Sequence, residues 1–415
     1  MTAESGAESG PESGAVSEAE SGVPLIYIIA GEASGDALGA GLIRALRAET
    51  GGRIEVAGIG GDRMAAEGLQ TLFPISEMAV MGIVEILPKA PKLLRRIGQT
   101  VADIQARRPA VVVTIDSKAF TMRVNKRLHA LRTKTGEGPK LIHWVPPTVW
   151  AWRPGRAEVI ARYLDHLLTL YPFEPPYFEA HGLPTTFVGH PAAVAPDGNG
   201  KRFKGRYGLP AGAPVLGLFP GSRPGEVKRL LPIFGDVVDR LAARYQGLRV
   251  VLPTVSGVAE AVREGTANWR APVSIVTEHR HKADAFAACT VALAASGTVT
   301  LELSLAGVPT VVAYRVNALS AAIARRLVDP EAVVLTNKLM GKRVIPQFLQ
   351  EDCTADRLTV AIERLFDDPR ARAEQGAASE AIRRMLTVDG EDPSVRAAKA
   401  VLKVTREEAD ALVAD

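Results

Sequence analysis

Short apolar runs alternate with amphipathic stretches along the first half of this 415-residue chain. Residues 24–30 form a continuous apolar run, typical of a strand buried on both faces. Residues 37–49 then place their leucines and isoleucine on one side of a helix. The same pattern predicts strands at 109–115, 140–145, 166–173 and 185–191 and a helix at 121–132. Strands and helices in alternation indicate βαβ units around a parallel sheet.

The pattern breaks at residues 192–214, which are rich in Gly, Pro and charge, and then begins again. Further strands are predicted at 215–219, 248–255, 289–296 and 309–316, with helices at 226–245 and 298–307. Residues 355–415 are helical in pattern and polar. We therefore expect an α/β protein with two strand-helix domains in tandem. The expected divisions are a tail at 1–22, domains at 23–195 and 196–370, and a C-terminal helical segment at 371–415.

Residues 1–22 repeat Glu-Ser-Gly, have almost nothing to bury, and are predicted to be a disordered acidic tail. They hold five of the 46 acidic residues and no Lys or Arg, so the rest of the chain carries 50 basic residues against 41 acidic ones. That excess favours anionic partners, such as nucleotide phosphates, an anionic lipid surface or nucleic acid.

Composition excludes several classes of protein. A hydrophobic content of 47% and a charged content of 23% are globular values, which excludes a disordered or fibrous chain. Two cysteines exclude a disulfide framework and a Cys-rich metal site. No stretch approaches the ~20 uninterrupted apolar residues of a membrane span, and the acidic start lacks the cationic region of a secretory signal. We expect a cytosolic protein that is peripheral to a membrane if its substrate is a lipid.

The first candidate site is the loop that follows residues 24–30. Gly31 and Gly35 let the backbone approach a ligand, and the next helix begins here with a partial positive charge. The acidic Glu32 and Asp36 argue against a simple phosphate cradle, so a site that accepts sugar hydroxyls is equally plausible. A tight turn whose glycines only permit packing is the alternative.

The second candidate site follows the first strand of the second domain, at FPGSRPGE (219–226). Gly221 permits close approach, Ser222 offers a hydroxyl, and Arg223 offers a permanent cation. Pro224 suits the first position of the next helix, and together these four residues would hold a diphosphate without a metal. An exposed turn with a solvent-facing Arg is the alternative.

The third candidate site is ASGTVTLE (295–302), where Ser296, Gly297 and Thr298 join a strand to a helix. Glu302 lies one turn inside that helix, where a carboxylate accepts both hydroxyls of a ribose in dinucleotide sites. A capped helix with a solvated Glu302 is the alternative.

Asp116 directly follows a buried apolar run, so its carboxylate at a strand end would serve as a general base. The alternative is an Asp that caps the next helix. No histidine pair has metal-ligand spacing, and we predict no metal site. His190, near the domain boundary, is the histidine best placed to contact a substrate.

A last candidate is an apolar patch at 78–87 followed by a basic cluster, which matches an anchor for an anionic bilayer. A core helix with a solvated basic edge is the alternative. The residues predicted to contact a membrane are Met81, Ile83, Ile86, Leu87, Lys89, Lys92, Arg95 and Arg96.

With these segments in view, the chain resembles the lipid-A-disaccharide synthase family over residues 24–370. The resemblance rests on motifs in family order: GEASGDALGAGLIRAL (31–46), AVMGIVEILPK (79–89), VWAWRPGR (149–156), FVGHP (187–191), FPGSRPGEV (219–227), ASGTVTLE (295–302), VVAYR (311–315) and LTNKLMGKRVIPQFLQED (335–352). It implies a GT-B-like fold, in which two Rossmann-like domains with parallel sheets face an interdomain cleft. It also implies an inverting, metal-independent glycosyltransferase.

The resemblance assigns roles to single residues. Asp116 matches the family's candidate base, and Glu302 matches the carboxylate at the uridine ribose. Ser222, Arg223 and Glu226 match the motif on the nucleotide side. Asn337 and Gln350 match polar cleft residues on the donor side, and Glu32 and Ser34 match the glycine-loop site on the acceptor side. The chain departs from the family's IDAPDF at Lys118 and Ala119, which adds a cation and removes a carboxylate. That departure bears on how the acceptor is bound.

The activity so implied joins UDP-2,3-diacylglucosamine to lipid X (2,3-diacylglucosamine 1-phosphate) through a beta-1,6 bond, with inversion and release of UDP. It belongs to lipid A and lipopolysaccharide biosynthesis. The resemblance places the enzyme at the cytoplasmic face of an anionic inner membrane, with no nucleic-acid partner and no cofactor, and leaves a homodimer open. The alternatives are a soluble UDP-sugar epimerase of the same two-domain layout and a non-catalytic nucleotide-sugar-binding module.

Overall fold

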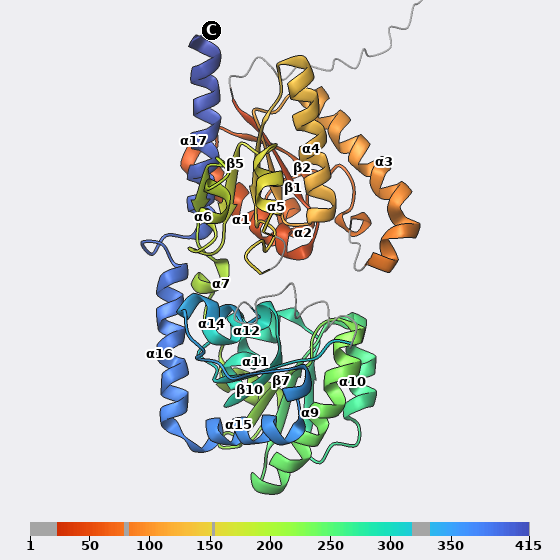
Figure 1. Cartoon of the computed structure of the whole chain (residues 1–415), viewed down its shortest axis with the longest axis vertical. Helices are drawn as coiled ribbons and strands as arrows, with labels where there is room; N and C mark the ends of the chain where they lie inside the picture. Colours follow the sequence, from red (N-terminus) through yellow and green to blue (C-terminus); the bar gives the residue numbers. More distant parts are fainter. Residues whose placement is uncertain (1–22, 79–82, 152–153, 318–332, 415) are drawn as a thin grey trace, which may run out of the picture.

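The protein folds into two lobes stacked along its long axis (Figure 1). The computed structural model describes residues 23–78, 83–151, 154–317 and 333–414. Each lobe is built on a six-stranded sheet with helices on both faces. We call the lobe at the top of Figure 1 the N lobe and the lobe at the bottom the C lobe. The predicted α/β class and the two tandem Rossmann-like units are confirmed.

The N-lobe sheet has the strand order β2-β1-β3-β4-β5-β6, and every neighbouring pair is parallel. Its strands are β1 (Leu25–Ala30), β2 (Glu55–Ile59), β3 (Val111–Ile115), β4 (Lys140–Trp144), β5 (His166–Thr169) and β6 (Thr185–Phe187). Its helices are α1 (Ala33–Thr50), α2 (Asp62–Ala66), the 3₁₀ turn η2 (Ile75–Glu77), α3 (Ile83–Arg107), α4 (Lys118–Thr135), α5 (Arg156–Ala161), α6 (Pro175–Glu179) and α7 (Pro191–Val194).

The C-lobe sheet repeats this design in the order β12-β11-β10-β7-β8-β9, again with parallel pairs throughout. Its strands are β7 (Val215–Phe219), β8 (Arg249–Pro253), β9 (Val273–Val276), β10 (Val291–Ala295), β11 (Thr310–Tyr314) and β12 (Gln347–Leu349). The helices of this half are α8 (Gly200–Tyr207), α9 (Pro224–Arg244), α10 (Ala259–Thr266), α11 (Lys282–Ala288), α12 (Thr298–Leu305), α14 (Leu335–Met340), α15 (Ala355–Asp367), α16 (Pro369–Leu386) and α17 (Pro393–Ala414). The 3₁₀ turns among the described residues of this half are η3 (Ser256–Val258), η4 (His279–His281) and η6 (Gln350–Asp352).

The continuous apolar runs follow from burial on both faces of each sheet. In β1, Ile26 and Ile28 pack toward α1, whereas Tyr27 and Ile29 pack toward α3 and α4. Successive side chains of a strand point to opposite faces, so a sheet covered on both sides needs apolar residues at every position. All four of these side chains have no exposed surface.

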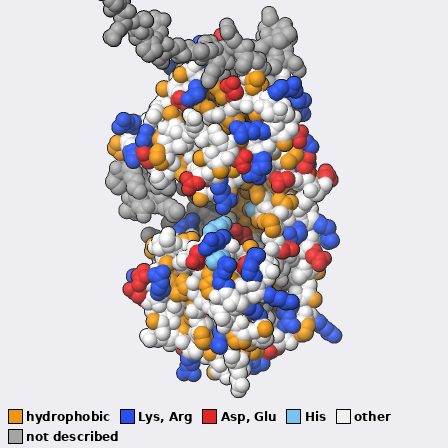
Figure 2. Space-filling view, turned by 180° about the vertical axis from the view of Figure 1, so that it is seen from behind, with side chains coloured by type: hydrophobic (Ala, Val, Ile, Leu, Met, Phe, Trp, Pro, Cys, Tyr) orange, Lys and Arg blue, Asp and Glu red, His pale blue; other side chains and the backbone are white. Residues whose placement is uncertain are grey.

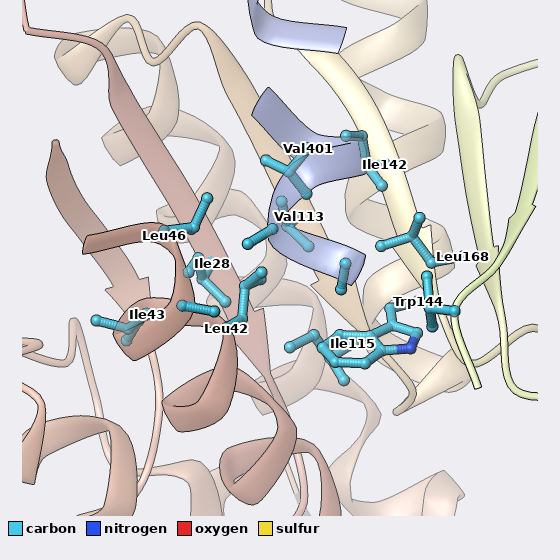
Figure 3. Packing of buried hydrophobic residues seen from close by; sticks show 14 of the residues in the cluster. Ile28, Leu42, Ile43, Leu46, Val113, Ile115, Ile142, Trp144, Leu168 and Val401 are labelled. Atoms are coloured by element: carbon cyan, nitrogen blue, oxygen red, sulfur yellow. The ribbon is translucent and has the colours of Figure 1, made fainter. Parts of the chain in front are cut away.

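The last helix, α17, completes the core of the N lobe rather than that of the C lobe. Figure 3 shows Val401 of α17 among strand residues such as Val113 and Ile142, with Leu42 and Leu46 of α1 beside them. We expected residues 371–415 to form one separate helical segment. The structure divides them, because α16 runs along the C lobe and α17 returns to the N-lobe sheet (Figure 1).

The chain therefore crosses between the lobes twice, and hydrogen bonds tie the two crossings together. Arg383 of α16 donates to the carbonyl of Ala193 at 3.0 Å and to that of Leu305, which joins α7, α12 and α16. Arg396 of α17 donates to the carbonyl of Phe187 at 3.2 Å, just before the first crossing. These bonds link the predicted boundary region to the C-terminal helices.

The sequence pattern did not predict the strands β2, β9 and β12, and their residues explain why. β2 begins with a Glu and contains Gly58, whose φ of 139° lies outside the range that other residues favour. A Cβ at this position would lie 1.9 Å from the carbonyl oxygen of Ile28, so only glycine fits between the strands. β9 and β12 have four and three residues, too few for a periodic signal.

We predict that α17 contributes directly to N-lobe stability. Val401→Ala removes two buried methyl groups and should lower the free energy of unfolding by about 2 kcal/mol. The matched control is Val360→Ala, whose side chain is 66% exposed and whose truncation should cost within about 0.5 kcal/mol. Urea denaturation followed by tryptophan fluorescence measures both. Equal losses in the two variants would show that α17 is not part of the N-lobe core.

Candidate active site

The motifs singled out from the sequence lie where strand order reverses in each sheet. In the N lobe, β1 lies between β2 and β3, so the loops after β1 and β3 diverge from a common edge. In the C lobe, β7 lies between β8 and β10 in the same way. Ligands of open parallel sheets bind beyond the carboxyl ends of the strands at such reversal points. The four loops concerned are 31–36, 116–118, 220–226 and 296–298.

A pocket of about 650 Å³ opens at the reversal point of the C lobe. Eight of the predicted donor-side residues line it: Gly221, Ser222, Arg223, Glu226, Ser296, Gly297, Thr298 and Glu302. Figure 2 shows Lys, Arg and His side chains gathered at the top of the C lobe, beside the hollow between the lobes. The structure thus brings together two motifs that lie some 75 residues apart in the sequence.

Glu226 organises the first of these motifs. Its Oε2 accepts hydrogen bonds from the amides of Ser222 and Arg223, at 3.2 and 3.3 Å, and its Oε1 pairs with the Arg223 guanidinium at 2.8 Å. Gly221 has a φ of 106°, and a Cβ there would lie 2.4 Å from Glu226 Oε2. Because Glu226 occupies these two amides, the cation available to a ligand at this turn is the exposed Arg223 side chain.

The second motif presents an uncapped helix. α12 begins after Gly297, and among the described residues no side chain caps its first turn. The Ser296 hydroxyl donates instead to the carbonyl of Val333 at 2.6 Å, and Thr300 Oγ1 donates to the carbonyl of Gly297 at 2.7 Å. The first amides of a helix carry partial positive charge and hold anions well. The first turn of α12 can therefore bind a phosphate that lies in the pocket.

Glu302 is held by a cation that the sequence analysis missed. Lys282 Nζ lies 2.9 and 2.7 Å from the two carboxylate oxygens of Glu302, and both side chains are about one third exposed. Lys282 opens α11 and borders the pocket together with Glu278 and His279. These residues follow β9, and a prediction of that strand would have placed them at the carboxyl edge.

Asp116 and Ser117 lie at the end of β3 in a left-handed backbone conformation, with φ of 45° and 46°. Non-glycine residues rarely adopt this conformation, and such strain gathers at functional sites. The Asp116 amide donates to the carbonyl of Trp144 at 2.9 Å, and Thr121 Oγ1 donates to the Asp116 carbonyl at 2.6 Å. The carboxylate is left exposed on one side and pairs with Lys118 at 3.4 Å.

The glycine loop after β1 lies against Asp116 because Gly31 has no side chain. A Cβ on Gly31 would lie 2.1 Å from Ser117 Oγ, so only glycine lets these two loops meet. Burial and the nearby Asp116 charge raise the pKa of Glu32, while Lys118 opposes them. Ser34 is exposed at the start of α1, whereas the buried Gly35 packs on β1 and β3.

A buried polar network supports the strained strand ends. Asn125 Nδ2 donates to Thr114 Oγ1 at 2.9 Å, Thr114 Oγ1 lies 2.8 Å from His143 Nδ1, and His143 Nε2 lies 3.2 Å from the carbonyl of Val145. Burial, with the Lys118 charge, lowers the pKa of His143 to about 3, so the ring is neutral. Its Nε2–H then donates to Val145, another residue with a positive φ, of 70°. This network of buried side chains therefore stabilises the ends of β3 and β4.

An aromatic cluster joins the lobes next to this edge. Lys338 of α14 lies 5.4 Å from the ring centre of Trp150 and 5.1 Å from that of Phe173, which places a C-lobe cation over N-lobe rings. Trp150 Nε1 donates to Glu174 at 3.2 Å, and Glu174 also accepts the amides of Leu170 and Tyr171. Burial raises the pKa of Glu174 to about 7, although these three donors favour the ionised form.

Three further candidate residues, His190, Asn337 and Gln350, lie in other parts of the structure. His190 caps α7 through the amide of Ala192 and stacks on Tyr171, with ring centres 5.6 Å apart. Asn337 is buried and bonds to the backbone of Val344 and Ile345, and Gln350 accepts the Val316 amide at 3.3 Å. Neither Asn337 nor Gln350 lines the pocket, so their roles in the cleft stay predictions.

The candidate membrane surface is described in part. Met81 and the side chains of Ile83, Ile86, Leu87 and Lys89 lie outside the described residues. Arg96 pairs with Glu77 at 2.7 Å and lies over the ring of Phe73. Lys92 and Arg95 are exposed on α3, with Leu94 between them in sequence and 49% exposed, although Lys92 also contacts Glu77 at 3.1 Å. No helix among the described residues is long and apolar enough to cross a membrane.

Comparison with known proteins identifies the family. A family model described as lipid-A-disaccharide synthetase matches residues 26–401. The lipid-A-disaccharide synthase of Rhodospirillum centenum is 50% identical to this chain, over 92% of this chain and 94% of the length of that synthase. The synthase of Paramagnetospirillum magneticum is 46% identical over 92% of this chain and 98% of its own.

Solved structures agree on the fold. A putative UDP-N-acetylglucosamine 2-epimerase from Listeria monocytogenes superposes with a TM-score of 0.62 at 14% identity, covering 91% of this chain and 94% of that one. The glycosyltransferase of kitacinnamycin gives 0.60 at 19% identity, covering 92% of this chain and 99% of that one. At such identities the likeness establishes a GT-B fold and leaves the reaction to the site and the family. The chain belongs to the lipid-A-disaccharide synthetase family of glycosyltransferases.

Proposed function

We propose that this enzyme transfers 2,3-diacylglucosamine from UDP-2,3-diacylglucosamine to the 6-hydroxyl of lipid X, with inversion and release of UDP. One observation carries the proposal: each lobe presents one set of functional loops at the reversal point of its sheet. The C-lobe loops line a pocket of nucleotide-sugar size, and the N-lobe loops present a carboxylate. A structural neighbour from Neisseria meningitidis, a UDP-GlcNAc 2-epimerase, is bound to UDP-GlcNAc and has a TM-score of 0.59.

The donor would lie in the C-lobe pocket. The uridine ribose hydroxyls would bond to Glu302, whose carboxylate Lys282 holds in place. The diphosphate would lie between the first turn of α12 and the Arg223 guanidinium. These groups would stabilise the negative charge that grows on the leaving diphosphate, without a metal. Among the described residues no three His, Cys, Asp or Glu side chains cluster as metal ligands.

The acceptor would approach from the N lobe. As its 6-hydroxyl oxygen attacks the anomeric carbon, the bond from that carbon to the diphosphate oxygen breaks, and its electron pair leaves with UDP. The proton of the hydroxyl passes to Asp116. The strained turn and the bonds from the Asp116 backbone to Trp144 and Thr121 keep the carboxylate in place.

The apolar α12 face links the two half-sites. Leu301 and Leu305 of α12 pack in one cluster with Trp144, Leu170 and Tyr171 of the N lobe. Leu301 is the neighbour of Glu302, so the donor-side helix shares one buried apolar cluster with residues at the carboxyl edge of the acceptor-side sheet. Motion of α12 relative to this cluster would open and close the cleft.

The assay of UDP release tests the reaction. The wild type should release UDP only when lipid X is present, and Asp116→Asn should reduce turnover by two to four orders of magnitude while UDP still binds. Asp62→Asn, at an exposed N-lobe position, is the control and should keep full activity. A changed sugar without release of UDP would instead indicate an epimerase, and binding alone would indicate a module without chemistry.

Glu302→Ala and Lys282→Met should act alike on the donor side. Each removes one half of a pair that would meet the ribose, so the KM for the UDP-sugar should rise about tenfold and the KM for the acceptor should not change. Steady-state kinetics with each substrate varied in turn provides the measurement. Glu264→Ala, an exposed change on α10, is the control. An unchanged donor KM in both variants would remove the pair from the donor site.

We also propose that the enzyme works at the cytoplasmic face of the inner membrane, where Lys92 and Arg95 contact anionic lipid. Lys92→Glu combined with Arg95→Glu should reduce association with anionic liposomes at least tenfold, because each such cation near a bilayer is worth about 1 kcal/mol. Sedimentation with liposomes measures it. Lys201→Glu combined with Arg370→Glu, exposed on the C lobe, is the matched control. Equal retention of both double variants would contradict a role for this part of α3.

A further inference from the structure

Lys118 is a cation that the proposed reaction does not use, and it lies directly beside the candidate base. It is the first residue of α4, and its Nζ lies 3.4 Å from Asp116 Oδ1. Its side chain is 37% exposed, so the ammonium group can exchange this contact for one with a ligand.

Carboxylates dominate the surroundings of Lys118. Glu32 and Asp116 lie on the two loops that meet at Gly31, and the buried Glu174 follows β5 on the same edge of the sheet. The charge of Lys118 reaches all three: it pairs with Asp116 and lowers the pKa of both Glu32 and Glu174 against the burial that raises them. Without Lys118 these three carboxylates would disfavour an anion bound at this edge.

The proposed acceptor brings an anion to this edge. In a hexose 1-phosphate, the anomeric carbon C1 carries the phosphate and C5 carries the 6-hydroxymethyl group. Both carbons are bonded to the ring oxygen. The phosphate and the 6-hydroxymethyl group therefore branch from the two neighbours of the ring oxygen, at the same edge of the ring. Before Asp116 takes the proton of that hydroxyl, its ionised carboxylate lies near the phosphate, and a cation beside both groups offsets the repulsion.

We propose that Lys118 binds the anomeric phosphate of the acceptor, so that it selects a sugar 1-phosphate over the same sugar with a free anomeric hydroxyl. This inference rests on the proposed function. The start of α4 supports it, because among the described residues no side chain caps this helix and its first amides add partial positive charge beside Lys118. An ammonium on a flexible stem suits a phosphate as a point charge.

A different role for Lys118 makes a different prediction. If it only oriented the Asp116 carboxylate, its loss would slow turnover of every acceptor and shift the pH profile, whether or not a phosphate were present. If it binds phosphate, its loss matters for the phosphorylated acceptor alone. Two acceptors that differ in this one group therefore separate the two roles.

The experiment compares short-chain 2,3-diacylglucosamine 1-phosphate with the same diacylglucosamine lacking the phosphate. Calorimetry measures the binding of each to the full-length enzyme saturated with UDP, and UDP release measures turnover. The variants are Lys118→Met, which keeps the length and removes the charge, and Lys118→Arg, which keeps the charge. Lys126→Met, an exposed position two turns along the same helix, is the control.

Lys118→Met should raise the Kd of the phosphorylated acceptor about tenfold and leave that of the other acceptor unchanged. Lys118→Arg should recover most of the affinity, and Lys126→Met should have no effect. Equal loss for both acceptors, or no loss for either, would overturn the proposal. The proposed function fails separately if the wild type releases no UDP with either acceptor, and in that case the binding comparison still decides the role of Lys118.

Discussion

All strands of each sheet are parallel, so every strand ends at the same edge, and this constraint places the chemistry of the whole molecule. Helices cover both faces of each sheet, which leaves the carboxyl edge as the place where loops can gather around a ligand. Where β1 and β3 diverge in the N lobe, and β7 and β10 in the C lobe, two loops separate and leave room between them. The acceptor-side and donor-side residues lie at these two places because the topology offers no comparable opening elsewhere on the sheets that the structure describes.

The proposed reaction makes opposite electrostatic demands on the two half-sites. In the proposed reaction the C-lobe pocket would hold growing negative charge, and it offers the start of an uncapped helix, an exposed guanidinium and a carboxylate already paired with Lys282. The N-lobe edge would present a carboxylate that accepts a proton, and this carboxylate lies in a strained turn next to a neutral His143, which bridges Thr114 and Val145. The neutral ring supports this turn without placing a buried charge next to it.

The sequence was informative wherever one short segment carried the signal. Apolar runs located the long buried strands, and the glycine loops with Asp116, Arg223 and Glu302 were identified from residue types at strand ends. Contacts between segments that lie far apart in the sequence could not be predicted from it. Lys282 pairs with Glu302 twenty residues away through the fold, and Glu226 accepts hydrogen bonds from the amides of Ser222 and Arg223 in the turn that was predicted to hold a diphosphate. The return of α17 to the first sheet was equally hidden, because an amphipathic helix shows that it has a partner but not which one.

That return has a consequence for how the chain matures on the ribosome. The face of the first sheet that α1 leaves uncovered is buried by Ala397, Ala398 and Val401, which follow the whole C lobe in the sequence. Domains usually fold in the order of their synthesis, but here the first six strands await a helix that is translated after the C lobe. The C lobe has most of its own core by Leu365 and can form before the N lobe is complete. Premature termination before Ala397 would thus expose apolar surface on the half of the protein that was made first.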